Sequence, residues 1–168
     1  MTNRTAWTAG NGQGLSAWSS RTTAFGTADL TSMADSKCVL STASAIANGT
    51  NLDMYMDISV QITVASSTPR AGGYIGIWLA MLMQDGSTYG DGQLTAGTQT
   101  TYLPPWAPLA VIPVANQAMT NMGGQATGLL IPPQSFALIC YNYTNVAFSG
   151  TAANNVVSFK TYNVNLNN

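Results

Sequence analysis

Apolar and polar side chains alternate through LDMYMDISVQITV, residues 52–64. The apolar positions are Leu52, Met54, Met56, Ile58, Val60, Ile62 and Val64. Because successive side chains of a strand point to opposite faces, this period of two predicts one long strand with a single buried face. Asp53 and Asp57 should then lie on its solvent face, where two like charges act as solvating groups rather than as a catalytic pair.

The sequence on either side of this stretch also favours strands. Residues 74–83 are apolar on both faces, as expected of a central strand covered on both sides. The proline-rich residues 103–114 exclude a helix and predict a loop that runs into a short edge strand. Further strands are expected at residues 127–131, 135–143 and 156–162.

The one stretch that favours a helical turn is residues 29–34, which would place Leu30, Met33 and Ala34 on one face. About eight strands separated by Gly, Pro and Asn turns are typical of an all-β fold. We therefore expect an antiparallel β-sandwich over residues 29–168, specifically a jelly roll.

Residues 1–28 form a distinct opening segment that is rich in Thr, Ser, Gly, Ala and Asn. It contains three aromatic residues, Trp7, Trp18 and Phe25, although disordered segments are poor in such residues. We interpret it as an extended N-terminal arm whose rings dock on another molecule. A loose tail is the alternative.

Charged residues make up only 7% of the 168-residue chain, which has no histidine and, since all six acidic residues are aspartates, no glutamate. Globular domains have roughly 25% charged residues. The usual proton carriers of acid–base catalysis are therefore scarce, and a Ser-His-Asp triad cannot be built. We expect a structural or binding protein that is not an enzyme and needs no cofactor.

The same composition bears on partners and location. A net charge of −1 with no basic cluster argues against nucleic-acid binding. The longest apolar run, residues 74–83, is much shorter than the roughly 20 residues that span a bilayer. The first thirty residues show no signal-peptide pattern, so we expect a protein that is made and assembled in a cytoplasm.

Two further features have a structural and a functional interpretation. Cys38 and Cys140 lie in apolar contexts and are expected to be free, buried thiols. Asp85 and Asp91 flank a Gly-rich loop that could hold calcium, but the spacing does not match an EF-hand, so tight turns are the favoured interpretation and no metal site is expected.

Among the remaining aromatic residues, Trp78 is expected in the core because its strand is apolar on both faces. Trp106 lies between prolines on a stiff loop and is the tryptophan most expected at an interface. The candidate interface residues are thus Trp7, Trp18, Phe25 and Trp106.

Several short motifs resemble small structural proteins from the head gene clusters of tailed bacteriophages. They are Asn51-Leu52-Asp53-Met54, residues 74–83 leading into Gln84-Asp85-Gly86-Ser87-Thr88-Tyr89-Gly90-Asp91-Gly92, Leu130-Ile131-Pro132-Pro133-Gln134-Ser135-Phe136, and Phe159-Lys160-Thr161-Tyr162-Asn163. The resemblance spans roughly residues 50–163. It implies a head decoration or cement protein: a jelly roll, commonly trimeric, that sits on the capsid surface and ties major capsid subunits together. It supplies no catalytic residues.

The sequence therefore leads to the hypothesis of a virion protein that binds the outside of an assembled phage capsid, with the major capsid protein as partner and a homotrimer as the expected state. Two alternatives stay open. One is a lectin-like module of a tail fibre that uses Trp106 and tyrosines to contact glycans. The other is a jelly-roll coat subunit.

Overall fold

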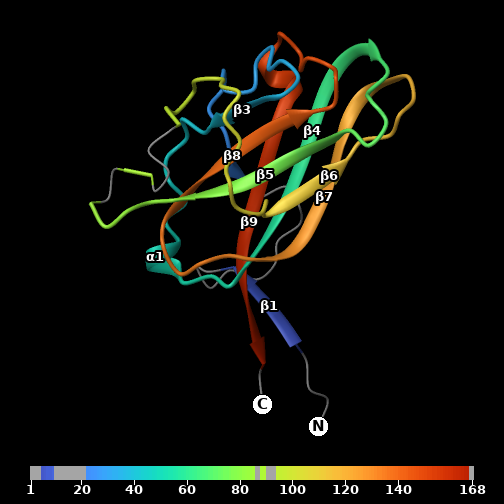
Figure 1. Ribbon diagram of the computed structural model, residues 1–168. Helices are drawn as coiled ribbons and strands as arrows, with labels where there is room; N and C mark the ends of the chain where they lie inside the picture. The colour runs from blue at the N-terminus through green and yellow to red at the C-terminus, as the bar shows by residue number, and fades with distance from the viewer. Residues whose placement is uncertain (1–4, 10–21, 86–87, 90–93, 167–168) are drawn as a thin grey trace.

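The computed structural model describes residues 5–9, 22–85, 88–89 and 94–166. Nine strands lie in these ranges (Figure 1): β1 Thr5–Ala9, β2 Thr22–Thr23, β3 Lys37–Leu40, β4 Tyr55–Ser67, β5 Tyr74–Met81, β6 Ala110–Pro113, β7 Met119–Leu130, β8 Phe136–Tyr143 and β9 Asn155–Leu166. The same ranges contain one α-helical turn, α1 Asn48–Asn51, and the 3-10 turn η2 Ala152–Asn154.

The strands form two antiparallel sheets. One has the order β1-β9-β4-β7, with β2 also paired to β9, and the other has the order β3-β8-β5-β6. The pairings nest along the chain, because β2 pairs with β9, β3 with β8, β4 with β7, and β5 with β6. The prediction of an all-β antiparallel sandwich is confirmed.

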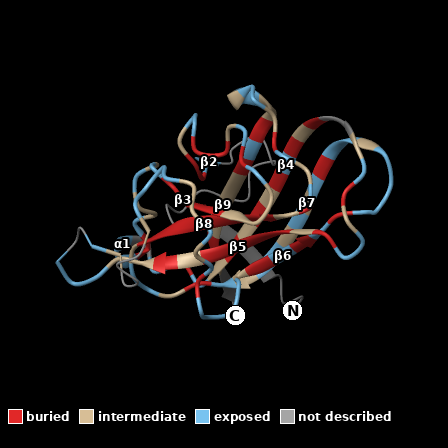
Figure 2. Cartoon of the chain, turned by 45° about the horizontal axis from the view of Figure 1, so that its top comes forward, coloured by how far each residue is buried: buried red, intermediate tan, exposed pale blue. Residues whose placement is uncertain are grey.

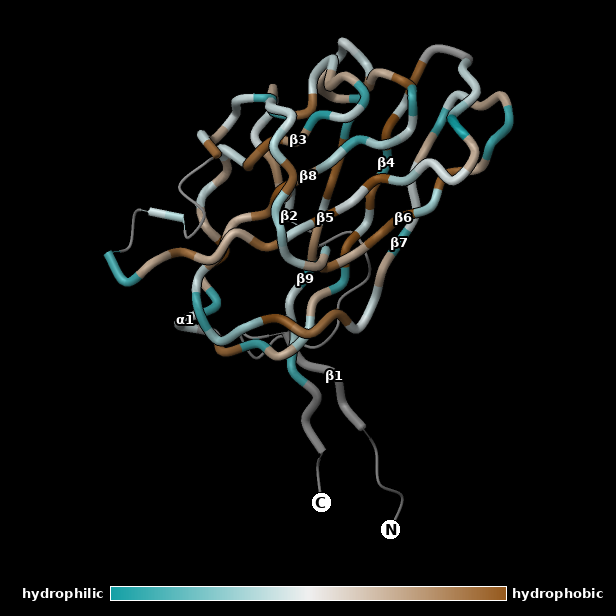
Figure 3. Tube along the Cα trace, viewed as in Figure 1, coloured by the Kyte–Doolittle hydropathy of each residue, from teal (hydrophilic) through white to brown (hydrophobic). Residues whose placement is uncertain are grey.

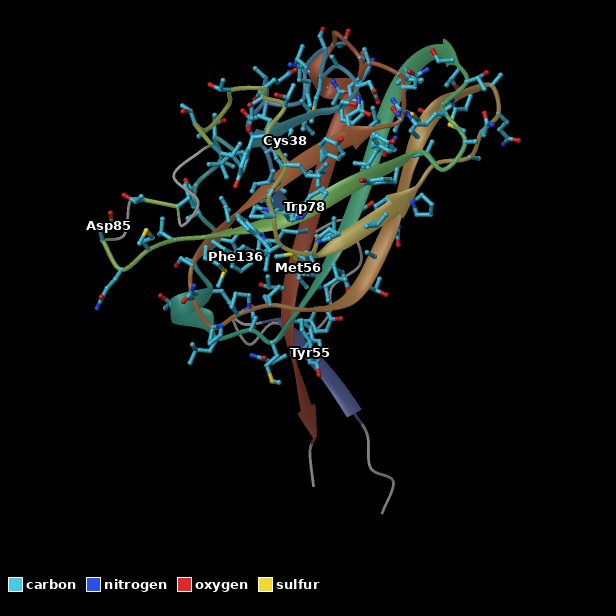
Figure 4. All side chains as sticks on the ribbon, viewed as in Figure 1. Cys38, Tyr55, Met56, Trp78, Asp85 and Phe136 are labelled. Carbon is cyan, nitrogen blue, oxygen red and sulfur yellow. The ribbon has the colours of Figure 1, made fainter. Side chains whose placement is uncertain are left out.

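The core lies between the two sheets and follows the predicted alternation of β4. Met56, Ile58, Val60, Ile62 and Val64 are buried, whereas the residues between them are partly or fully exposed. They pack with inward residues of the opposite sheet, including Ile75, Ile77, Phe136 and Leu138. Figure 4 labels Met56 and Phe136, which come from opposite sheets. The long strand thus supplies one face of the core.

The central strand expected at residues 74–83 is confirmed as β5. It lies between β8 and β6, and both of its faces are largely buried, as they are in β8 (Figure 2). The edge strand expected after the prolines is also present, as β6. Strands β7 and β9 are longer than predicted, since they span 12 residues each.

Asp53 does not lie on the solvent face of β4, and this prediction is corrected. The strand begins at Tyr55, and Asp53 precedes it with only 1% of its surface exposed. The side chain of Asn48 fixes its backbone, because Asn48 Oδ1 accepts the Asp53 N–H at 2.8 Å and Asn48 Nδ2 donates to the Asp53 carbonyl at 2.9 Å. Asp57 is half-buried on the outer face.

Residues 29–34 form successive hydrogen-bonded turns rather than the predicted helical turn. Leu30 and Met33 are buried, but Ala34 is exposed. The carboxylate of buried Asp29 accepts the N–H of Gly26 at 2.8 Å and the N–H of Thr42 at 2.7 Å, and Ser32 has a left-handed φ of 52°. The left-handed Ser32 interrupts a helix at this point, and the bond from Thr42 ties Asp29 to a distant part of the chain.

The end of the segment assigned to the arm packs in the sandwich. Strand β2 pairs with β9, and Phe25 is a core residue with 4% exposure. Strand β1 pairs with the far end of β9, from Tyr162 to Leu166. The described parts of residues 1–28 therefore occupy two successive stretches of one edge of β9.

Candidate interaction surfaces

Few of the charged side chains in the described part of the chain are fully exposed. The structure describes eight of the eleven charged residues: Asp29, Asp35, Lys37, Asp53, Asp57, Arg70, Asp85 and Lys160. Of these eight, only Asp85 is exposed; Asp29 and Asp53 are buried, and the other five are half-buried. Figure 4 places Asp85 at the end of a projecting hairpin.

Three of the five half-buried charged residues, Asp35, Asp57 and Arg70, contact neighbouring groups in the described part of the chain. Arg70 and Asp35 form an ion pair, and the Arg70 guanidinium lies 4.1 Å from the ring centroid of Tyr143. Asp57 accepts the Gly128 N–H at 2.9 Å and the Tyr162 hydroxyl at 3.0 Å. Burial, followed by the hydrogen bond to Asp57, raises the pKa of Tyr162 to about 12, so its hydroxyl stays a donor at neutral pH.

The central part of the outer face of the five-stranded sheet carries neutral polar side chains, whereas Asp57 of β4 and Lys160 of β9, which are paired in register, lie toward the Tyr55 end of the same face. We call this surface the polar face and define it by Ser59, Gln61 and Thr63 of β4, Asn121 and Gln125 of β7, and Ser158 of β9. Cross-strand register places Ser59 between Gln125 and Ser158, and Thr63 opposite Asn121, to which it donates at 3.0 Å. All six side chains are partly or fully exposed. Amides and hydroxyls cost less to desolvate than ions, so this face is suited to being covered.

The outer face of the four-stranded sheet differs. It holds a second apolar cluster formed by Cys38, Leu40, Trp78, Ala80, Ala137, Ile139 and Tyr141, against which Tyr74, Tyr89, Leu94 and Tyr143 pack. The last part of the connection from β5 to β6, residues 94–109, contacts the same sheet. Its residues 96–100 bond to the edge of β3, through Gly97 to Leu40 and Thr100 to Cys38.

The structure places Trp106 on the surface and also gives it a structural role. Its indole N–H donates to the Leu79 carbonyl at 3.2 Å, and its own carbonyl accepts the indole N–H of Trp78 at 2.8 Å. Trp106 thus occupies the edge of β5 beyond the end of β6. Since 39% of its surface remains exposed, its ring is available to a partner.

Of the other three candidate residues, Phe25 is the one whose side chain the structure describes, and it does not lie with Trp106. Phe25 lies in the core, where it cannot serve an interface, because the chain enters the sandwich at β2. Trp7 lies in β1, in register with Val164, and Trp18 falls outside the described residues.

One end of the sandwich has exposed apolar residues, and the prediction that Leu52 and Met54 lie on the buried face of the long strand is corrected, because β4 begins only at Tyr55. Leu52, Met54 and Leu130 are 55%, 54% and 68% exposed. They are neighbours across β4 and β7, since Tyr55 is paired with Leu130 and the Ile131 N–H donates to the Met54 carbonyl at 3.1 Å. We call these three residues the apolar end. In hindsight, Leu52 and Met54 continue the alternation of β4 beyond the strand itself.

Both cysteines are free and buried, as predicted. In the register of β3 and β8, Cys38 is paired with Tyr141 and Val39 with Cys140, so the two thiols lie on opposite faces of the sheet. This register cannot accommodate a disulfide between them. Burial, and to a lesser degree the neighbouring Cys38, raises the pKa of the Cys140 thiol, which is therefore unreactive.

Asp85 supports the turn interpretation of its loop, because its carboxylate accepts the Thr88 N–H at 2.8 Å. Asp91 lies outside the described residues. Within the described ranges, no three His, Cys, Asp or Glu side chains group as metal ligands. None of the helices described here is long and apolar enough to cross a membrane.

Two depressions of the surface are lined mainly by small or polar residues. One lies at Ser67, Thr68 and residues 145–150, and the other lies between β2, residues 43–47 and β9. Neither includes Trp106 or a tyrosine, so neither provides the aromatic platform expected of the glycan-binding alternative.

Comparison of the chain with protein-family models, with curated proteins and with solved structures finds no match.

Proposed function

We propose that this protein is a virion component that binds the outside of an assembled phage capsid as a decoration or cement protein. The observation that supports this most is the scarcity of exposed ions: one of eight described charged residues is exposed. A partner that covers the polar face has few charges to desolvate, which favours lasting contact. The proposed partner is the major capsid protein, and the proposed location is the capsid surface.

The nested strand pairing supports the finer classification of the sandwich as a jelly roll. If a long antiparallel hairpin of eight strands is rolled up, its first strand pairs with its last, its second with its seventh, and so on. Strands β2 to β9 pair in this way, and the further pairings β4 with β9 and β5 with β8 join the rolled halves.

The mechanism we propose is mass action. A protein that binds the assembled shell and not its separated subunits stabilises the shell by its own binding free energy. A homotrimer, as the resemblance implies, would add to this by effective concentration once its first copy is bound. No catalytic step and no cofactor is involved.

The first test is the protein composition of purified particles from the parent phage. We expect this chain on intact heads, accessible to protease or antibody from outside. Intact heads without the chain would contradict the proposal.

A sharper test adds the purified protein to shells that lack it, at about 0.05 M and about 1 M NaCl. Since salt screens charges and the six residues of the polar face carry none, affinity should change less than about threefold if the contact is confined to them. The variant Gln125→Lys should weaken binding at least tenfold, whereas Thr151→Lys, on the exposed turn before η2, should bind like the parent chain. Equal effects of the two variants would exclude the polar face as the contact.

The nested pairing also favours a second candidate, a jelly-roll coat subunit, since this fold builds viral capsids. Two measurements distinguish a cement protein from a coat subunit: the number of copies per particle, and whether heads form when the chain is absent. A cement protein is dispensable for forming heads, whereas heads cannot form without a coat subunit.

A further inference from the structure

The last part of the connection from β5 to β6 forms a strap over the outer face of the four-stranded sheet. We define the strap as residues 94–109, all of which the structure describes. Its first half is bonded to the edge of β3, where the Gly97 N–H donates to the Leu40 carbonyl at 2.8 Å. Its end is bonded to the edge of β5, where the Leu109 N–H donates to the Ile77 carbonyl at 2.7 Å. Figures 1 and 3 show the strap crossing in front of β8 and β5 before it enters β6.

The strap and the face beneath it differ in burial. Pro104 is the single buried residue of the strap, and most of its other residues are exposed. On the sheet below, Cys38, Leu40, Trp78 and Ile139 are at most 3% exposed. The strap therefore keeps water from the sheet while it buries little apolar surface of its own. Segments with few buried apolar groups open at a lower free energy than the strands of a core.

Three contacts hold the middle of the strap against the sheet. The Cys38 thiol donates to the Tyr102 carbonyl, the Trp78 indole N–H donates to the Trp106 carbonyl at 2.8 Å, and the Trp106 indole N–H donates to the Leu79 carbonyl at 3.2 Å. Cys38 and Trp78 belong to the apolar cluster on the outer face, which is separate from the core between the sheets. These contacts can therefore break together without separating the two sheets.

Two features of the sequence favour movement of the strap as one unit. Pro104, Pro105 and Pro108 fix the φ angles of its second half, so this half is stiff. Gly97 has a left-handed φ of 73°, and a Cβ added to it would lie 2.7 Å from Thr42 Cγ2. The closed position of the strap thus depends on a glycine at position 97.

We infer that the strap is a lid, which opens and closes as one unit while the sandwich stays folded. Opening breaks the bonds of the strap to β3 and β5 and uncovers the outer apolar cluster. The pairings of β8 with β3 and with β5 stay intact. The lid gives the molecule a second surface, covered in the closed state, that is apolar and lies on the opposite sheet from the polar face.

The two cysteines report opening and unfolding separately. Cys38 lies under the strap, whereas Cys140 lies in the core between the sheets, on the other face of the same sheet. Opening of the strap exposes the Cys38 thiol alone, whereas global unfolding exposes both thiols. The rates at which a thiol reagent labels the two cysteines therefore distinguish a lid from a permanently closed connection.

The test is labelling of the purified full-length chain with an uncharged maleimide at neutral pH, with each labelled cysteine located by peptide mass spectrometry. We expect Cys38 to react at least about tenfold faster than Cys140. The Cys38 rate should also rise less steeply with urea, because opening exposes less surface than unfolding does. Equal rates for the two thiols, rising together with urea, would overturn the inference.

The variant Gly97→Ala should raise the Cys38 rate at least about tenfold, because an alanine at this φ is strained and its Cβ meets Thr42 in the closed state. The matched control is Gly72→Ala, at a φ of 70° in the turn before β5, where an added Cβ has nothing within 4 Å. It adds similar backbone strain away from the strap and should change the Cys38 rate less than about twofold. Equal acceleration by the two variants would mean that Cys38 reacts through global unfolding, which contradicts the lid.

A second variant keeps the test decisive if Gly97→Ala does not fold. Trp106→Phe keeps an aromatic ring but removes the indole N–H that bonds the strap to the Leu79 carbonyl. It should raise the Cys38 rate about fivefold and leave the Cys140 rate unchanged. A Cys38 rate that Trp106→Phe does not raise contradicts the lid. Because no shell is present, failure here is distinct from failure to bind capsids.

Discussion

The outer faces of the two sheets differ in polarity: one is apolar and covered, and the other is polar and exposed. The four-stranded sheet has an aromatic and aliphatic outer face with Trp78 at its centre, and the chain covers it with its own long connection and with Tyr74 and Tyr143. The five-stranded sheet has the polar face, which the described residues leave accessible. One outer face is thus covered by other parts of the chain, whereas the described part of the other is exposed and would cost little to desolvate.

The largest expected effect is on the covered face. Trp78→Ala should destabilise the fold by about 3–5 kcal/mol, because the indole is 3% exposed and donates to the Trp106 carbonyl. The ring also lies over Gly76, where an added Cβ would be 2.3 Å from it, so Gly76 has no side chain that could fill the cavity. Chemical denaturation measures the loss. A change below about 1 kcal/mol would mean that this face is not a second core.

The contrast between the faces explains which parts of the fold the sequence predicts. Strand β4 was predictable because one of its faces is buried, which gives alternating apolar and polar residues. Strand β5 was predictable because both of its faces are buried, which gives a continuous apolar run. Strand β7 was largely missed because Met122 is its single fully buried residue, so its pattern of Gly and polar residues has no apolar period. Strand β3 has only four residues, too few to show a period.

The missed features of the candidate surfaces depend on contacts between distant residues. The burial of Asp53 depends on Asn163, which is 110 positions away, and the position of Trp106 depends on Trp78 and Leu79. Local pattern could identify Trp106 as a stiffly held aromatic residue. It could not show that both its indole and its carbonyl are used within the fold, nor that Phe25 is part of the core.

A smaller effect is expected at Tyr162 of β9. Tyr162→Phe removes the hydroxyl that donates to Asp57, which keeps its bond from Gly128, so the loss at neutral pH should be about 1 kcal/mol. Folding raises the pKa of Tyr162 from 10.0 to about 12. The folded state therefore holds this proton more tightly, and the contribution is complete below pH 10.0 and is lost as pH rises to about 12.

Denaturation of the parent chain and of Tyr162→Phe at about pH 9 and about pH 12 measures this contribution. The difference in stability between the two proteins should shrink at the higher pH. Comparing the two proteins is necessary because burial also raises the pKa of Tyr141 and of Cys140, which add to the alkaline sensitivity of both. A difference that does not depend on pH would show that the Tyr162 hydroxyl is not the group that titrates.

The smallest effect on folding is expected at the centre of the polar face. Gln61 is exposed on β4, between Gly123 of β7 and Val156 of β9, and no described residue covers it. Gln61→Lys should therefore change the free energy of unfolding by less than about 0.5 kcal/mol, a tenth or so of the Trp78→Ala effect. If the same variant also leaves capsid binding unchanged, the polar face is merely solvated. If binding falls at least tenfold while stability holds, the charge deficit of this face serves contact with a partner and not the fold.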